Sequence, residues 1–313
     1  MRTSAAPDTI ALTLLDDSLY VVFRDHGTSN QLYCAHSTDG LQWSSAKKIT
    51  DSRPVDLKTE KFPGLATLNG KLVLAFTLEA SSEVYVSLSS DGESWEAAFQ
   101  TGIHNYTPAL TTYLDNEGIE TLAMVYSDQG GEQVHYSSSK DGKMWEKRND
   151  PEAKCNRPVL ATMGGLVQEL QGRGILVTVY SSSKGPQLYS HFNSGPDYKD
   201  WGEGKQIGGQ KTQNVGGLAW LPQPDSNQGK LDGCLVLVYQ STDDRTAVIT
   251  RTWDGSTWEG ANFSKLNPTP DDGYVPAMAF HHEKKLAMVY QSSQKLYVTF
   301  SGDGLTWKDA KEM

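Results

Sequence analysis

The chain has 313 residues and a formal net charge of −10, from 28 Lys and Arg against 38 Asp and Glu. A surface of this sign repels phosphate groups, so we expect neither nucleic acid nor an anionic membrane surface as a partner. Hydrophobic residues make up 37% of the chain and charged residues 21%, a balance typical of a folded, soluble protein. The 14 Tyr, 8 Trp and 29 Gly favour an all-β structure with tight turns.

The first 50 residues contain one repeat unit. Its second strand is predicted at 19–23, where every residue is apolar, and its third strand at 32–36, where polar and apolar residues alternate. Asp39 and Gly40 then form a turn, and Trp43 follows on a short outer strand.

The same unit recurs five more times. The Trp residues that close the six copies are 52, 50, 56, 57 and 49 residues apart, at Trp43, Trp95, Trp145, Trp201, Trp258 and Trp307. A period near 50 with β patterning is typical of propeller blades. We predict one six-bladed β-propeller domain over residues 1–313, with four antiparallel strands per blade. The expected blades span about 7–50, 60–102, 105–150, 156–208, 214–264 and 274–313.

The inner strands of the blades share two patterns. First strands open with Pro or Gly and small apolar residues, at 63–66, 108–110, 158–161, 216–219 and 276–279. Second strands are apolar on both faces, which predicts burial between neighbouring blades. Because each repeat begins with a first strand, we expect the ring to close by packing between the first and last blades, although exchange of a short strand is left open.

The Asp-Gly turns are interpreted as structural rather than as six sugar sites. The Asp carboxylate can accept hydrogen bonds from its own turn, Gly supplies a positive φ, and Trp packs between blades. The fourth copy, at 195–201, lacks the Asp-Gly pair.

Two family resemblances follow from these motifs. Residues 301–307 (SGDGLTW) resemble a shortened Asp-box of sialidase-like propellers. The chain length, the number of blades and residues 251–260 (RTWDGSTWEG) resemble those of the six-bladed fucose-binding propeller lectins. This resemblance implies glycan binding. Those lectins hold fucose with an Arg on the second strand and a Glu on the third. Fucose specificity is not carried over, because the matching positions are Val21, Leu74, Met124, Thr178, Leu237 and Met288 for Arg, and Cys34 and Val298 for Glu.

A ligand site is predicted where second strands end and first strands begin, at one end of the central channel. The polar and aromatic residues there differ between repeats, so the packing of the repeat does not require them. A cation and a rigid aromatic ring near one axis can bind a carboxylate, a sugar hydroxyl or a ring face. The candidates are Arg24, Asp25, His26, Lys61, Tyr106, Asp128, Arg157, Gln240, Tyr274 and Gln291.

No catalytic, phosphate-binding or calcium-binding motif is recognised, so no cofactor and no metal are expected. The three cysteines, Cys34, Cys155 and Cys234, lie in different repeats and are predicted to be reduced, buried thiols. Residues 1–7 lack the apolar core of a signal peptide, and the apolar runs are strand-sized. We expect no membrane insertion, and a cytoplasmic location or export without a standard signal.

Three functions are compatible with this sequence. The first is a lectin-like module that binds a carbohydrate or another small polar ligand, which the missing catalytic motifs favour. The second is an enzyme that uses the central channel, sialidase-like or acting on another small molecule, with Arg24, Arg53 and Arg157 as candidate cations. The third is a protein-interaction scaffold. The sequence leaves the ligand, its valency and the oligomeric state open.

Overall fold

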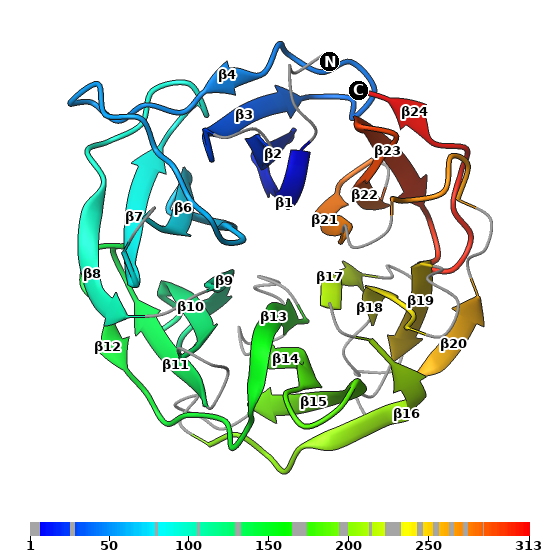
Figure 1. Cartoon of the computed structure of the whole chain (residues 1–313). Helices are drawn as coiled ribbons and strands as arrows, with labels where there is room; N and C mark the ends of the chain where they lie inside the picture. The colour runs from blue at the N-terminus through cyan, green and yellow to red at the C-terminus, as the bar shows by residue number, and fades with distance from the viewer. Residues whose placement is uncertain are drawn as a thin grey trace.

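The computed structural model describes residues 7–25, 29–78, 81–104, 107–128, 133–164, 174–193, 200–212, 215–222, 233–242, 247–252, 257–262, 266–271, 275–283 and 285–313. These residues form 24 β-strands and no helix. The strands make six four-stranded antiparallel sheets, which are arranged as a ring around a central axis (Figure 1). The predicted all-β, six-bladed propeller is confirmed.

The first three blades are consecutive in the chain. Blade 1 contains β1 (Pro7–Leu15), β2 (Ser18–Asp25), β3 (Leu32–Ser37) and β4 (Lys47–Lys48). Blade 2 contains β5 (Gly64–Leu68), β6 (Lys71–Thr77), β7 (Glu83–Ser89) and β8 (Phe99–His104). Blade 3 contains β9 (Ala109–Leu114), β10 (Glu120–Ser127), β11 (Val134–Ser139) and β12 (Glu146–Lys147).

The last three blades complete the ring. Blade 4 contains β13 (Cys155–Met163), β14 (Ile175–Ser182), β15 (Gln187–Asn193) and β16 (Lys205–Lys211). Blade 5 contains β17 (Val215–Pro222), β18 (Gly233–Gln240), β19 (Ala247–Thr252) and β20 (Glu259–Asn262). Blade 6 contains β21 (Ala277–His281), β22 (Lys285–Ser292), β23 (Lys295–Ser301) and β24 (Lys311–Glu312).

Within each blade the strands follow their order in the chain, so the first strand lies at the axis and the fourth at the rim (Figure 1). Because neighbouring strands are antiparallel, the hairpins between first and second strands share one end of the ring with the Asp-Gly turns. We call this end the turn face. The opposite end, where first strands begin and second strands lead into third strands, is the start face.

The hydrophobic core is divided into six clusters, one at each junction between blades. Each cluster combines apolar residues of two neighbouring blades with one of the six motif Trp side chains. At the junction of blades 1 and 6, Ile10 and Phe23 pack with Val289 and Phe300. Among the described strands, β24 pairs with β23 of its own blade. Closure by packing between the first and last blades is therefore confirmed.

The Asp-Gly turns have the predicted structural geometry in blades 1, 2, 3 and 6. In blade 1 the Asp39 carboxylate accepts hydrogen bonds from the backbone N–H groups of Leu41 and Gln42, at 2.8 and 2.7 Å. Gly40 has a φ of +68°, and Trp43 Nε1 donates to its carbonyl at 3.1 Å. Asp91, Asp141 and Asp303 accept the same two backbone bonds. The copies at Asp197 and Asp254 lie outside the described residues.

The three cysteines are free and buried, as predicted. Burial raises the pKa of the Cys34 and Cys155 thiols to about 12 and that of Cys234 to about 11, so all three are protonated at neutral pH. None of the segments that the structure describes is a helix with the length and apolarity needed to cross a membrane.

Candidate functional site

A collar of six apolar side chains surrounds the axis, one from the first strand of each blade. Each member is between 6% and 8% exposed, and each pairs with the equivalent residue of its own second strand. This regularity follows from the repeat, because equivalent positions of the inner strands meet at the axis. The collar consists of Leu12, Leu65, Leu110, Leu160, Leu218 and Met278.

The collar separates two axial hollows, since its six residues line both of them. The hollow on the turn face, the axial cavity, has a volume of about 600 Å³. The hollow on the start face, the axial recess, has a volume of about 120 Å³. A volume of 600 Å³ lies within the range of small-molecule sites, about 300–1,000 Å³.

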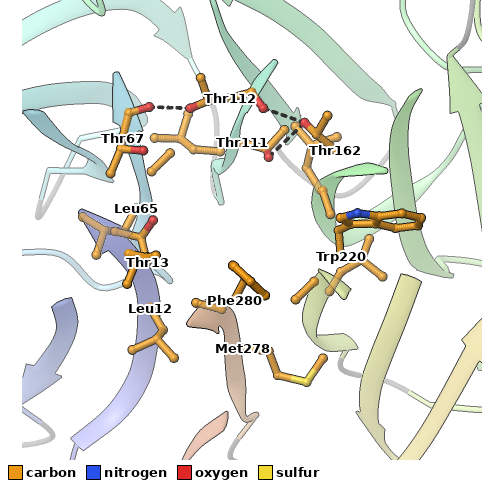
Figure 2. Close-up of a pocket in the computed structure, with 18 of the residues that line it drawn as sticks. Leu12, Thr13, Leu65, Thr67, Thr111, Thr112, Thr162, Trp220, Met278 and Phe280 are labelled. Carbon is orange, nitrogen blue, oxygen red and sulfur yellow. Dashed lines mark hydrogen bonds between the residues drawn. The ribbon is translucent and has the colours of Figure 1, made fainter. Parts of the chain in front are cut away.

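The wall of the axial cavity differs from blade to blade. Two residues past the collar, blades 2, 3 and 4 each carry a threonine, whereas blades 5, 6 and 1 carry apolar residues (Figure 2). Because side chains of a strand alternate, these six positions face the channel in the same way as the collar. They are Thr67, Thr112, Thr162, Trp220, Phe280 and Leu14.

Hydrogen bonds connect the threonines across three blades. Thr112 Oγ1 donates to the carbonyl of Thr67, and Thr162 Oγ1 donates to the carbonyl of Thr112 at 2.7 Å (Figure 2). Thr111 Oγ1 lies 3.2 Å from Thr162 Oγ1. Since the one hydroxyl proton of Thr162 is already donated, Thr111 is the donor of that pair. The three protons are thus used within the wall, and the oxygens keep lone pairs that can accept hydrogen bonds.

Aromatic side chains line the opposite side of the axial cavity. Phe280 is half-buried. Its ring lies edge-on to the ring of the exposed His282, and the two ring centroids are 5.5 Å apart. The indole of Trp220 fits against Gly233, where an added Cβ would lie 2.5 Å from its Cζ2 atom. Gly233 at the start of β18 therefore makes room for this ring.

Among the described residues that line the axial recess on the start face, one is charged, Arg157 of β13. Its guanidinium carbon lies 3.4 Å from the centroid of the Phe62 ring, which belongs to the segment before β5. Burial lowers the pKa of the Arg157 guanidinium to about 9, so the group remains positively charged at neutral pH.

The sequence-predicted site residues are spread around the start face, and of those that the structure describes only Arg157 lines an axial hollow. Arg24 donates to the carbonyl of Thr59 at 3.3 Å, and the buried Asp25 accepts from Ser29. Asp128 accepts from the N–H of Gln133, and Gln291 is buried and donates to Asp271.

Lys61 and Gln240 are half-buried at the ends of loops on the same face. His26, Tyr106 and Tyr274 lie outside the described residues. The role of the ten candidates in ligand binding stays a prediction.

The larger of the two axial hollows thus lies on the turn face. This is the end of the channel opposite to the one that the sequence interpretation selected. The threonine row, Trp220 and Phe280 were missed because nothing in their local sequence marks them as axial. A comparison of the six first strands at the second position after the collar would have found them, since three polar and three apolar residues occupy it.

A third hollow, the rim pocket, lies between blades 3 and 4 and has a volume of about 650 Å³. Trp201, Tyr189 and His191 line it together with four carboxylates, those of Asp150, Glu152, Asp200 and Glu203. His191 is bound on both sides, because its Nδ1 lies 2.9 Å from the Gly202 carbonyl and its Nε2 lies 2.8 Å from the Tyr180 hydroxyl. Burial lowers the pKa of His191, which favours the neutral ring.

Several polar groups of the rim pocket are already paired within the protein. Asp150 accepts from Tyr136 N–H and lies 2.8 Å from His135 Nδ1, and Trp201 Nε1 donates to the carbonyl of Asn149. Within the described part of the chain, no group of three or more His, Cys, Asp or Glu side chains is arranged to hold a metal ion.

The positions that match the fucose-binding Arg of the lectins are fully buried in the second strands. Val21, Leu74, Met124, Leu237 and Met288 lie in the cores between blades, and Thr178 donates its hydroxyl to the Val159 carbonyl. A lectin-type clamp therefore has no accessible counterpart at these positions.

Solved structures with the same fold include lectins and a sialidase. The protein AofleA from Arthrobotrys oligospora matches with a TM-score of 0.69 and 10% identity over 98% of this chain and 86% of its own. The lectin of Aleuria aurantia, solved with alpha-methyl-L-fucoside, matches with a TM-score of 0.67 and 12% identity over 98% and 96%. The chain shares their fold. The resemblance to the fucose-binding propeller lectins is thus confirmed at the level of the fold.

The Hadza microbial sialidase Hz136 matches with a TM-score of 0.65 and 14% identity over 98% of this chain. The match spans 66% of the sialidase chain. No protein-family model matches the sequence, and no curated protein matches it.

Proposed function

We propose that the chain is a lectin-like protein that binds a neutral carbohydrate, or a similar polyhydroxylated molecule, in the axial cavity on the turn face. The observation that supports this is the division of the cavity wall into a hydroxyl side and an aromatic side. A sugar ring has the same two surfaces, with hydroxyls around its edge and a C–H face that packs on aromatic rings.

The hydrogen-bonding capacity of the wall favours a ligand that donates. Thr111, Thr112 and Thr162 use their hydroxyl protons within the wall, so their oxygens are available as acceptors. Sugar hydroxyls are donors that match such acceptors, while Trp220 and Phe280 provide the apolar surface opposite.

The ionisable groups of the axial cavity favour a neutral ligand. Among the described lining residues, the ionisable groups are those of Asp16 and His282, and both residues are exposed. Most glycoside hydrolases use a pair of carboxyl groups on either side of the bond that they cleave, and sialidases use a Tyr nucleophile instead. Since the described part of this wall offers one carboxylate and no Tyr, its residues support binding better than hydrolysis.

The test begins with a glycan array, which selects the ligand, followed by calorimetry with the best-bound mono- or disaccharide. Thr112→Val is expected to weaken binding about 2- to 10-fold, because it removes one hydrogen-bond acceptor. Phe280→Ala is expected to weaken it by a similar factor, because the sugar loses an aromatic surface.

Thr101→Val is the matched control. Thr101 is also half-buried and also donates to a backbone carbonyl, that of Val84 at 2.8 Å, but it lies on β8 at the rim. It should leave binding unchanged. If Thr112→Val and Phe280→Ala bind as the wild type does, while Trp201→Ala abolishes binding, the ligand lies in the rim pocket and the axial assignment is wrong.

A further inference from the structure

Among the described residues, the axial recess on the start face contains a cation without a matching anion. Arg157 is half-buried as a residue, but its Nη1 atom is buried and has no hydrogen-bond partner among the described residues. Among the described side chains that line the recess, none is Asp or Glu. A buried charge that lacks a counter-charge is costly unless something else compensates it.

The position of Arg157 places this cation across the channel mouth. The residue belongs to blade 4, yet its guanidinium stacks on Phe62 before blade 2, so the side chain spans the mouth past blade 3. Stacking uses the face of the guanidinium and leaves its in-plane N–H donors directed sideways. Those donors are the groups that bind a carboxylate in a planar, bidentate manner.

We propose that the axial recess binds the carboxylate of a small organic acid, with Arg157 as the anion-binding residue. The volume of about 120 Å³ corresponds to roughly four water molecules at about 30 Å³ each, enough for a carboxylate and the first carbons of its chain.

The collar favours an organic acid over an inorganic anion. The inner wall of the recess is the ring that contains Leu12, Leu65, Leu160 and Met278. An alkyl stem gains free energy by contact with these side chains, whereas sulfate or phosphate would lose hydration there without compensation. This site lies at the other end of the channel from the proposed carbohydrate site, so each proposal can fail without the other.

The experiment measures binding of acetate, butyrate and hexanoate to the full chain by calorimetry at fixed ionic strength, with sodium sulfate and hexanol as reference ligands. Affinity is expected to rise with chain length, by up to about fourfold for each methylene that reaches the collar. Arg157→Gln should weaken hexanoate binding about 10- to 100-fold, because it removes a charge-assisted pair of hydrogen bonds.

Two further variants separate binding from folding. Arg157→Lys keeps the charge but loses the planar fork, so it should fold and bind hexanoate several-fold more weakly. Arg148→Gln is the matched control, because Arg148 pairs with Glu146 and Ser138 on the outer part of blade 3. It should bind hexanoate as the wild type does.

Three results would overturn the proposal. The first is unchanged hexanoate affinity in both Arg157 variants. The second is sulfate binding as tight as that of hexanoate, which would identify an inorganic-anion site. The third is hexanol binding as tight as that of hexanoate, which would mean that the collar alone is recognised.

Discussion

The turn aspartates stabilise the protein through backbone hydrogen bonds that the ionised carboxylate accepts more strongly than the protonated acid does. Backbone N–H groups of Gln42 and Leu41 lower the pKa of Asp39, and the N–H of Ser94 makes the largest contribution to the lowered pKa of Asp91. The pKa values of the Asp141 and Asp303 carboxyls are lowered as well. Four blades thus share one acid-sensitive element.

These lowered values predict loss of stability in acid. A carboxyl group whose pKa is lower in the folded state contributes stability above its unfolded pKa, near 3.9, and loses it as pH falls through the folded value. The melting temperature should therefore decrease as the pH falls below about 4. Thermal unfolding measured from pH 7 to pH 2.5 checks this.

Asp91→Asn should flatten that acid-dependent decrease, because the amide oxygen accepts the turn bonds without titrating. Asp17→Asn is the control, because Asp17 is exposed. It should leave the dependence of melting temperature on pH as in the wild type. An unchanged slope in Asp91→Asn would mean that other carboxyl groups cause the acid sensitivity.

The structural roles of residues could be predicted from the sequence where the same residue types recur in each repeat. The turn Asp, Gly and Trp recur at fixed spacing, so their shared structural role is readable. Arg157 was selected because it differs from its counterparts. Thr112 and Trp220 could not be selected in this way, since their position in the cavity wall depends on how six separate strands surround the axis.

At the scale of elements, the motif Trp is the residue that joins neighbouring blades. Trp95 is buried between blades 1 and 2, and its Nε1 donates to the carbonyl of Gly92 at 3.2 Å. Trp95→Ala should decrease the free energy of unfolding by about 3–5 kcal/mol, because it leaves a cavity between blades. Urea denaturation measures this difference.

Trp201→Ala provides the comparison, since Trp201 is half-buried at the open rim pocket and its removal should cost less. A Trp95→Ala variant that unfolds at the wild-type urea concentration would show that this Trp does not join the blades.

Strand positions were predictable because period-two and continuous apolar patterns depend on local burial. The second strand of blade 1, β2, is therefore found where the sequence predicts it, at 19–23. The hollows were not predictable in the same way. Their volumes depend on how far apart six first strands are held, which no single strand encodes.

The whole molecule is a ring with two different axial ends. The turn face has a cavity with a hydroxyl side and an aromatic side, and the start face has a small recess that contains Arg157. The six-membered collar lies between them. Six equivalent interblade sites would need polar residues repeated in every blade. The turn aspartates and the serines two residues before them do repeat in blades 1, 2, 3 and 6, and they are occupied by hydrogen bonds within the turns.

The stoichiometry of carbohydrate binding tests this account most directly. Calorimetry with the saccharide selected on the array should give one ligand per chain, because a single axis is shared by six blades. A value of four to six ligands per chain would contradict the axial site and would assign binding to the junctions between blades.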